Sequence, residues 1–275
     1  MANIAGCGKL IALEGIDGSG KRTQLDLLAG ALEARGFSTF RISFPRYESF
    51  YGKLIGQYLN GEFGALGAVD PHLSALLYAG DRLEAKPEIE AALSAGTIVL
   101  ADRYFGSNMA HQSARVAPEK REEFFAWLKH LEYGLYGLSA EDLVIYLRVP
   151  VAEAHRLVGL KAERAYTSLK HDIQEADIKY LEQTAIIYER LATDANWTRI
   201  DCSSAATVDG GLGERIGHDG AVFTAEDIEK KEKSPGGLLA PEEIHRAVLR
   251  VVEMRILSQL SPAPAEDAGR RKGTP

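Results

Sequence analysis

Cysteines and long apolar runs are both scarce in this chain of 275 residues. Its two cysteines, Cys7 and Cys202, cannot form a disulfide framework and lack the spacing of metal ligands, which indicates a reducing compartment. No stretch approaches the roughly 20 apolar residues needed to cross a bilayer, and the first residues lack the pattern of a signal peptide. We therefore expect a cytoplasmic protein with no membrane partner.

Basic residues are also fewer than acidic ones. The chain has 32 lysines and arginines against 39 aspartates and glutamates, a net charge of −7. This balance argues against broad electrostatic binding of nucleic acid, which needs a basic face, but it allows a local basic pocket for a small phosphorylated ligand. Hydrophobic residues make up 45% of the chain, enough to bury a full core at this length.

Strand and helix patterns alternate along the sequence. Short apolar runs predict strands at 9–14, 38–44, 97–101, 143–149 and 197–202. Helical spacing and capping signals predict helices at 21–35, 70–95, 118–137, 172–193 and 241–260. Pro87 is expected to kink or divide the second helix, and Asp172 to cap the fourth. This alternation predicts an α/β fold with helices on both faces of a five-stranded parallel sheet.

Two segments depart from the alternation. Residues 203–237 are rich in glycine and charge, which predicts an insertion into a single domain of residues 9–260. Residues 261–275 form a short tail of proline, alanine, glycine and charge, and we expect this tail to be disordered.

A glycine-rich motif links the first strand to the first helix. Gly15, Gly20 and Lys21 match the pattern G-x-x-x-x-G-K of a phosphate-binding loop, in which backbone N–H groups and the lysine hold phosphate oxygens. Arg22 occupies the position of the usual Ser or Thr that contacts Mg²⁺, and Thr23 follows one residue later. The residues predicted to bind ATP are Gly15, Gly18, Ser19, Gly20, Lys21, Arg22 and Thr23.

Acidic and basic side chains stand where the sheet is expected to end. Asp17, inside the glycine-rich loop, is either a turn-former or a hydrogen-bond acceptor for a substrate hydroxyl. Asp102 and Arg103 directly follow a buried strand, where open α/β sheets bind ligands. Asp102 is suited to hold Mg²⁺ through water, and Arg103 to stabilise a transferring phosphoryl group; a salt bridge at the strand end is the alternative.

Further candidates for a nucleotide site follow the second strand and lie on two helices. Arg46 in the segment Phe44–Tyr47 is suited to bind a phosphate, although exposed arginines are common in loops. Tyr78 and Arg82 share a helix face and could stack on a base and bond its carbonyl, or form a capped core aromatic. Ser107, Asn108, His111 and Gln112 lie on one helical turn that either reads a base or faces solvent.

A basic segment precedes the helix that Asp172 is expected to cap. Lys161, Arg164 and Lys170 could close over phosphates as a lid, or form an ordinary solvated face.

Taken together, these motifs resemble the thymidylate kinase family, whose members phosphorylate dTMP to dTDP with ATP. The blocks that carry the resemblance are LIALEGIDGSGKRTQ, FPRY, YAGDR, ADRY with SNMAHQ, and DIQEADIKYLEQTAIIYERLA, with a weaker match at PEEIHRAV. The resemblance implies a P-loop NTPase fold with a helical lid, Mg²⁺ as cofactor, and a homodimer. Some bacterial members look similar in having Lys-Arg-Thr in the loop, so Arg22 is tolerated.

The resemblance also implies roles for individual residues. Lys21 and Arg22 would hold ATP phosphates, Asp17 would meet the 3′-hydroxyl of the sugar, and Arg46 and Arg103 would bind the dTMP phosphate. The thymine would stack on Tyr78 and bond Arg82. The remaining expected contacts are Phe44, Tyr47, Ser107, Asn108, His111 and Gln112 for the substrate, Arg164 for catalysis, and Asp17 and Asp172 beside Asp102 for the metal.

Two departures keep other functions open. His111 and Gln112 stand where family members vary, so the chain could prefer another nucleoside monophosphate or deoxynucleoside. Arg22 could displace the metal and leave a catalytically silent nucleotide-binding regulator. The expected insertion at 203–237 falls near the adenine site of the family and could alter the preference for the phosphate donor.

Overall fold

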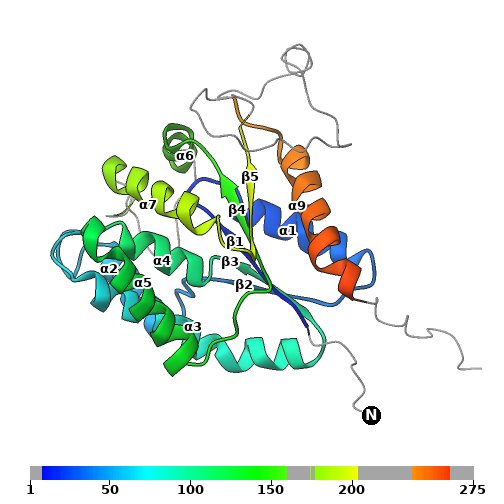
Figure 1. Cartoon of the computed structure of the whole chain (residues 1–275), viewed down its shortest axis with the longest axis horizontal. Helices are drawn as coiled ribbons and strands as arrows, with labels where there is room; N and C mark the ends of the chain where they lie inside the picture. Colours follow the sequence, from blue (N-terminus) through cyan, green and yellow to red (C-terminus); the bar gives the residue numbers. More distant parts are fainter. Residues whose placement is uncertain (1–7, 160–173, 175–176, 204–236, 261–275) are drawn as a thin grey trace, which may run out of the picture.

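The core of the protein is a sheet of five parallel strands (Figure 1). The computed structural model describes residues 8–159, 174, 177–203 and 237–260. The strands are β1 (Leu10–Glu14), β2 (Thr39–Ser43), β3 (Ile98–Asp102), β4 (Leu143–Arg148) and β5 (Trp197–Asp201), in the order β2-β3-β1-β4-β5. The predicted α/β fold with a five-stranded parallel sheet is confirmed.

Burial on both faces explains why the central strands β1, β3 and β4 lack polar alternation. Every residue of β1 is buried, as are the first five of the six residues in β4, as expected for a parallel sheet covered by helices. The register pairs Leu13 with Asp102 and Ser43 with Asp102, so β1, β2 and β3 end at the same edge. This shared carboxyl edge is where the chain can assemble a site.

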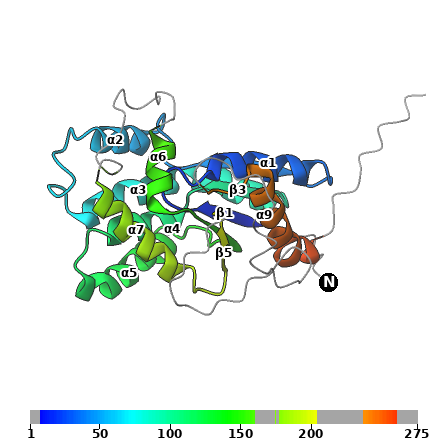
Figure 2. The same ribbon diagram turned by 90° about the horizontal axis from the view of Figure 1, so that it is seen from above.

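Helices cover the two faces of the sheet unequally. Figure 2 shows α1 (Lys21–Glu33) and α9 (Pro241–Arg255) together on one side. The other side carries α3 (Pro71–Ser94), α4 (Phe105–Ser113) and α7 (Ile178–Leu191), with α5 (Arg121–Lys129) packed against α4. The remaining α-helices are α2 (Phe50–Leu59), which packs on α3, and α6 (Val151–Val158). No helix in the described part of the chain is long and apolar enough to cross a membrane.

The predicted helices differ from the observed ones at several points. Pro87 lies inside α3, which continues from Pro71 to Ser94 without division; burial of neighbouring residues such as Ile89 offsets the backbone hydrogen bond that a proline removes. The fourth predicted helix, α7, begins at Ile178, where Asp177 caps it by accepting a hydrogen bond from the backbone N–H of Tyr180. Asp172, the expected cap, lies outside the described residues.

The other predicted helices also end differently. The one expected at 118–137 is divided into a 3₁₀ turn at Pro118–Lys120, α5, and a π-helical turn at His130–Leu135. The one expected at 241–260 ends at Arg255 and is followed by a 3₁₀ turn, Leu257–Gln259. The helices α2 and α6 were not predicted. The proposed insertion, apart from its ends, and the proposed tail lie outside the described residues.

Candidate active site

The loop between β1 and α1 turns in a way that requires glycine. Gly15, Gly18 and Gly20 have φ angles of 144°, 87° and 84°, which residues with a Cβ rarely adopt. A Cβ added at Gly18 would lie 2.3 Å from the carbonyl oxygen of Ala154 in α6. The glycines therefore allow a tight turn from the strand into the helix, with α6 packed against it.

Lys21, the first residue of α1, folds back over this loop. Its Nζ donates hydrogen bonds to the carbonyl oxygens of Gly15 and Ile16, both at 3.0 Å, and to Ser19 Oγ at 3.3 Å. The N-cap residue Gly20 supplies no side-chain cap, so the first N–H groups of α1 face the loop with the positive end of the helix dipole. A buried lysine beside an uncapped helix N-terminus suits the binding of phosphate.

The two residues after Lys21 lie on the exposed side of α1. The Arg22 side chain is 71% exposed, and its Nε donates to Asp26 Oδ2 at 3.1 Å. Thr23 is exposed as well. The guanidinium of Arg22 is thus engaged by an acidic neighbour, and its predicted contact with ATP stays a prediction.

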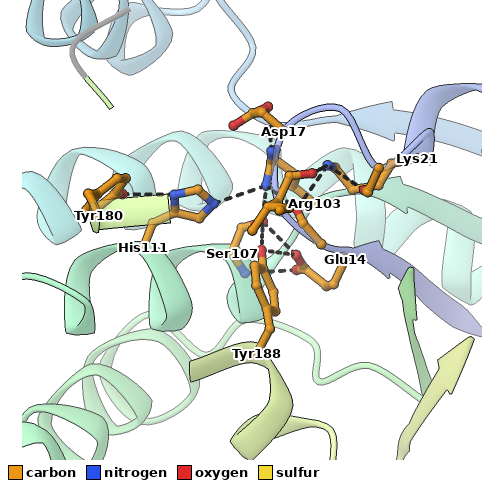
Figure 3. A network of polar contacts seen from close by, with 11 residues as sticks. Glu14, Asp17, Lys21, Arg103, Ser107, His111, Tyr180 and Tyr188 are labelled. Carbon is orange, nitrogen blue, oxygen red and sulfur yellow. Dashed lines mark hydrogen bonds and ion pairs between the residues drawn. The ribbon is translucent and has the colours of Figure 1, made fainter. Parts of the chain in front are cut away.

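Arg103 connects the end of β3 to the glycine-rich loop (Figure 3). Its φ of 68° is unusual for a residue with a side chain. Its Nη2 donates to Asp17 Oδ1 at 2.7 Å, and its Nη1 donates to the carbonyl oxygen of Gly15 at 3.1 Å and to Ser107 Oγ at 3.0 Å. Burial acts to lower the pKa of Arg103, but Asp17 and the other surrounding groups outweigh it and raise that pKa well above its usual value.

His111 extends the same network toward α7 (Figure 3). Its Nε2 lies 3.4 Å from Arg103 Nη1 and its Nδ1 lies 2.9 Å from the hydroxyl oxygen of Tyr180. Burial, and after it the charge of Arg103, lower the pKa of His111 to about 3. The imidazole is therefore neutral at physiological pH; since arginine only donates, Nε2 accepts and Nδ1–H donates to Tyr180.

Glu14 is a residue of this network that the sequence analysis missed. Its Oε1 accepts hydrogen bonds from the backbone N–H groups of Tyr104 and Ser107, at 2.8 and 2.9 Å. Its Oε2 accepts from Ser107 Oγ at 2.6 Å and from the Tyr188 hydroxyl at 3.0 Å. This fully buried carboxylate joins β1 to the start of α4. In the sequence, Glu14 could have been recognised as a functional candidate because it is a charged residue inside an otherwise apolar strand.

Arg46 is held by a second missed acid, Asp81. Asp81 is 1% exposed and accepts from Arg46 Nε at 3.0 Å, from the backbone N–H of Arg46 at 2.8 Å and from Ser49 Oγ at 2.9 Å. The Arg46 side chain is 20% exposed. Asp81 therefore fixes a guanidinium that is still reachable by a ligand.

Arg82 and Asn108 share a third missed acid, Glu132. Glu132 accepts from Arg82 Nε and Nη2, both at 2.6 Å, in a pair whose side chains are 2% and 0% exposed. Glu132 Oε1 also accepts from Asn108 Nδ2 at 2.8 Å. The shared carboxylate places the Arg82 and Asn108 side chains next to each other.

One cleft collects most of the predicted substrate residues. Ten of the eleven predicted substrate contacts line it, all but Arg46. Those ten are Asp17, Phe44, Tyr47, Tyr78, Arg82, Arg103, Ser107, Asn108, His111 and Gln112. Pro45, Leu59 and Gln174 complete the lining and were not predicted. The cleft thus runs from the glycine-rich loop, at Asp17, to the polar faces of α3 and α4.

On the α4 side of this cleft, two buried amide atoms have no hydrogen-bond partner among the described residues: Asn108 Oδ1 and Gln112 Nε2. Both side chains are at most 2% exposed. Because an unpaired buried polar group is costly, such atoms indicate positions where a ligand supplies the partner.

Asp102 offers an oxygen ligand at the carboxyl edge of the sheet. Its Oδ1 is buried and likewise lacks a hydrogen-bond partner within the described part of the chain. The described residues contain no cluster of three or more His, Cys, Asp or Glu side chains that could hold a metal ion alone. Arg164 and Asp172, predicted for catalysis and the metal, lie outside the described residues, as does the basic lid segment.

The family model of thymidylate kinase matches residues 13–208. This chain belongs to the thymidylate kinase family. It is 34% identical over 184 residues to the thymidylate kinase of Mycobacterium tuberculosis, covering 66% of this chain and 85% of that protein. It is 30% identical over 233 residues to the human thymidylate kinase, covering 84% of this chain and 97% of that protein.

Solved structures agree on the fold. The thymidylate kinase of Candida albicans superposes with a TM-score of 0.60 at 18% sequence identity, covering 90% of this chain and 92% of that one. A thymidylate kinase is a nucleoside monophosphate kinase, so membership of the family makes this chain an enzyme of that class.

Proposed function

We propose that this chain transfers the γ-phosphoryl group of ATP to dTMP, giving dTDP and ADP. The observation that carries the proposal is the arrangement of the cleft. One end lies at the glycine-rich loop that suits the donor phosphates, and the other end presents buried, unpartnered amide atoms to a base. A member of the thymidylate kinase family with this cleft has the parts that the reaction requires.

The base end of the cleft presents hydrogen-bonding groups in the order donor, acceptor, donor. Arg82 uses Nε and Nη2 for Glu132, which leaves Nη1–H donors for a ligand. Asn108 comes next and offers Oδ1 as an acceptor, and Gln112, one helical turn further, offers Nε2–H as a donor.

Thymine has the complementary edge, with a carbonyl on each side of the N3–H group. Cytosine and adenine instead present an amino group and an unprotonated ring nitrogen, which would face Arg82 and Asn108 with the wrong polarity. Uracil shares the edge of thymine and differs by the 5-methyl group, which a hydrophobic pocket distinguishes by about 10-fold or more. The cleft therefore favours dTMP over dCMP and AMP strongly, and over dUMP more weakly.

The phosphate end is suited to neutralise charge rather than to make covalent bonds. Phosphoryl transfer needs the donor and acceptor held in line and the developing charge stabilised. Lys21 and the N-terminus of α1 serve the ATP phosphates, while Arg103 and Arg46, each aligned by a carboxylate, serve the dTMP phosphate. Asp17 accepts from Arg103, and the resemblance to the family places it against the sugar 3′-hydroxyl.

The ligand that we propose for Mg²⁺ is Asp102, which precedes Arg103 at the end of β3 and does not itself line the cleft. The unpartnered Oδ1 of Asp102 is an oxygen donor of the kind that Mg²⁺ prefers, and a single carboxylate with phosphates and water is a usual ligand set for this ion. When bound, the ion neutralises charge on the transferring phosphoryl group. We also propose a homodimer in the cytoplasm, on the resemblance to the family and the low cysteine content, which light scattering and localisation of a tagged chain test.

A coupled assay for ADP release tests the proposal with dTMP, dUMP, dCMP, UMP and AMP as acceptors. We expect the highest kcat/KM with dTMP. Faster turnover of dCMP, UMP or AMP would overturn the choice of substrate. ATP binding without transfer to any acceptor would instead support a silent nucleotide-binding regulator.

A pair of arginine variants tests the phosphate end. Arg103→Ala should lower kcat by roughly 10²–10³-fold, since it removes preorganised charge stabilisation. The control is Arg199→Ala. Arg199 is an exposed arginine of β5 that pairs with Glu189 at 2.9 Å and does not line the cleft. The kcat of this variant should be unchanged. Near-normal turnover of a folded Arg103→Ala enzyme would remove Arg103 from the catalytic residues.

A further inference from the structure

The orientation of the Gln112 side chain is fixed from behind, on the side away from the substrate cleft. Gln112 Oε1 accepts hydrogen bonds from Ser74 Oγ at 2.8 Å and from Arg115 Nη1 at 3.3 Å. A guanidinium has only donors, so it requires the oxygen of the amide and not its nitrogen on this side. The Nε2–H group is thereby turned toward the cleft.

Arg115 is itself held in place by several groups. Its Nη1 donates to the hydroxyl of Tyr58 at 3.0 Å and to Ser74 Oγ at 2.8 Å. Its Nη2 donates to the carbonyl oxygen of Leu66 at 2.7 Å and to that of Val69. Since these acceptors fix the guanidinium, Arg115 cannot move away if the Gln112 amide turns over. It also does not line the substrate cleft.

We infer that Arg115 and Ser74 are positioning residues that keep the N–H group of Gln112 turned toward a carbonyl of the substrate base. They act on the substrate only through Gln112. The inference rests on the proposed function, because it takes the base to be a 2,4-dioxopyrimidine. Without the two residues, the amide would present its oxygen to that carbonyl for part of the time, and two acceptors would then face each other.

Asn108 on the same helix has an equivalent arrangement. Its Nδ2 donates to Glu132 Oε1 at 2.8 Å and to the carbonyl oxygen of Ala75 at 3.0 Å. Both partners are acceptors, so they require the nitrogen of the amide and turn Oδ1 toward the cleft. The two amides are thus held in opposite orientations by groups of opposite polarity, as the edge of a 2,4-dioxopyrimidine demands.

The test is a double-mutant cycle measured as kcat/KM for dTMP. Arg115→Met should lower kcat/KM by roughly tenfold through KM for dTMP, about the value of one neutral hydrogen bond, and leave KM for ATP unchanged. In the background Gln112→Ala, the same replacement should have no further effect, because the residue through which Arg115 acts is gone. Arg115→Lys, which keeps a donor, should restore most of the loss.

Ser74→Ala keeps the test informative if Arg115→Met does not fold. It removes one hydroxyl donor to Gln112, and we expect a loss of about threefold that also disappears in the Gln112→Ala background. The matched control is Arg121→Met, since Arg121 donates to the carbonyl oxygen of Val116 and to Gln183, away from the cleft. It should leave KM for dTMP unchanged.

Each result distinguishes the inference from the proposed function. A loss that persists in the Gln112→Ala background, or no loss in folded Arg115→Met and Ser74→Ala enzymes, would overturn the positioning role while dTMP kinase activity stands. If the unaltered enzyme does not phosphorylate dTMP, the proposed function itself fails.

Discussion

Removing the carboxylate of Glu132 should destabilise the protein severely. Glu132→Ala would leave the Arg82 guanidinium, 2% exposed and held by two hydrogen bonds of 2.6 Å, as a buried cation without a counter-ion. Breaking a buried pair on one side costs about 3–5 kcal/mol. The loss of the acceptor for Asn108 Nδ2 adds to this cost. Out of a typical stability of about 5–15 kcal/mol, this is a large fraction.

Equilibrium unfolding in urea, without nucleotide, measures this loss. Thermal unfolding should show a fall in Tm on the order of 10 °C for a domain of this size. The matched control is Glu253→Ala, because Glu253 is 44% exposed and accepts from Arg35 at 2.7 Å. An exposed pair contributes at most about 1 kcal/mol. If Glu132→Ala costs no more than Glu253→Ala, the buried pair does not stabilise the fold as we infer.

Three further predictions concern the loop, the core and the pH dependence. Gly18→Ala should weaken ATP binding by at least tenfold in a calorimetric titration. The added Cβ would lie 2.3 Å from the Ala154 carbonyl oxygen, and the φ of 87° at this position disfavours a side chain. Unchanged affinity for ATP would show that the loop adapts. Burial raises the pKa of Glu141 to about 7, although a hydrogen bond from Tyr133 acts to lower it. The folded state thus binds this proton more tightly than the unfolded state, and the protein loses stability as the pH rises from about 4.5 through 7. Glu141→Gln should therefore raise Tm at pH 8 and leave it nearly unchanged at pH 4.5. An equal change of Tm at the two pH values would contradict this pKa. Burial and Arg103 lower the pKa of His111 to about 3, so His111 should not titrate between pH 5 and 9. The pH profiles of kcat/KM for His111→Gln and for the unaltered enzyme should therefore have the same shape in this range. A step near pH 6.5 that the variant lacks would show that His111 titrates there.

The glycine-rich loop was predictable because its chemistry is local. The φ angles of its glycines and the return of Lys21 onto the loop depend on residues within six positions of one another. The same holds for β1 and α1, which the apolar run and the helical spacing on either side of the loop predicted. Helix boundaries were less predictable, because many polar residues can cap a helix and packing selects the one that does; for α7 that residue is Asp177.

The carboxylates that hold the site were not predictable. Asp81 lies 35 residues from Arg46, Glu132 lies 50 from Arg82, and Glu14 lies 93 from Ser107. Glu14 stood out in the sequence only as a charged residue in an apolar strand, and Asp81 and Glu132 read as ordinary acids in helices. Their partners are set by the order of the strands and by the packing of α3 against α4, which no local pattern encodes.

By itself, therefore, the sequence determined which residues could touch a nucleotide, because motif spacing and helical periodicity are short-range properties of the chain. Only the tertiary structure decided how those residues are oriented. Arg82 and Arg46 could have been solvated side chains, and the Gln112 amide could have faced either way. Distant groups remove that freedom: buried carboxylates hold the two arginines, and Arg115 holds the amide.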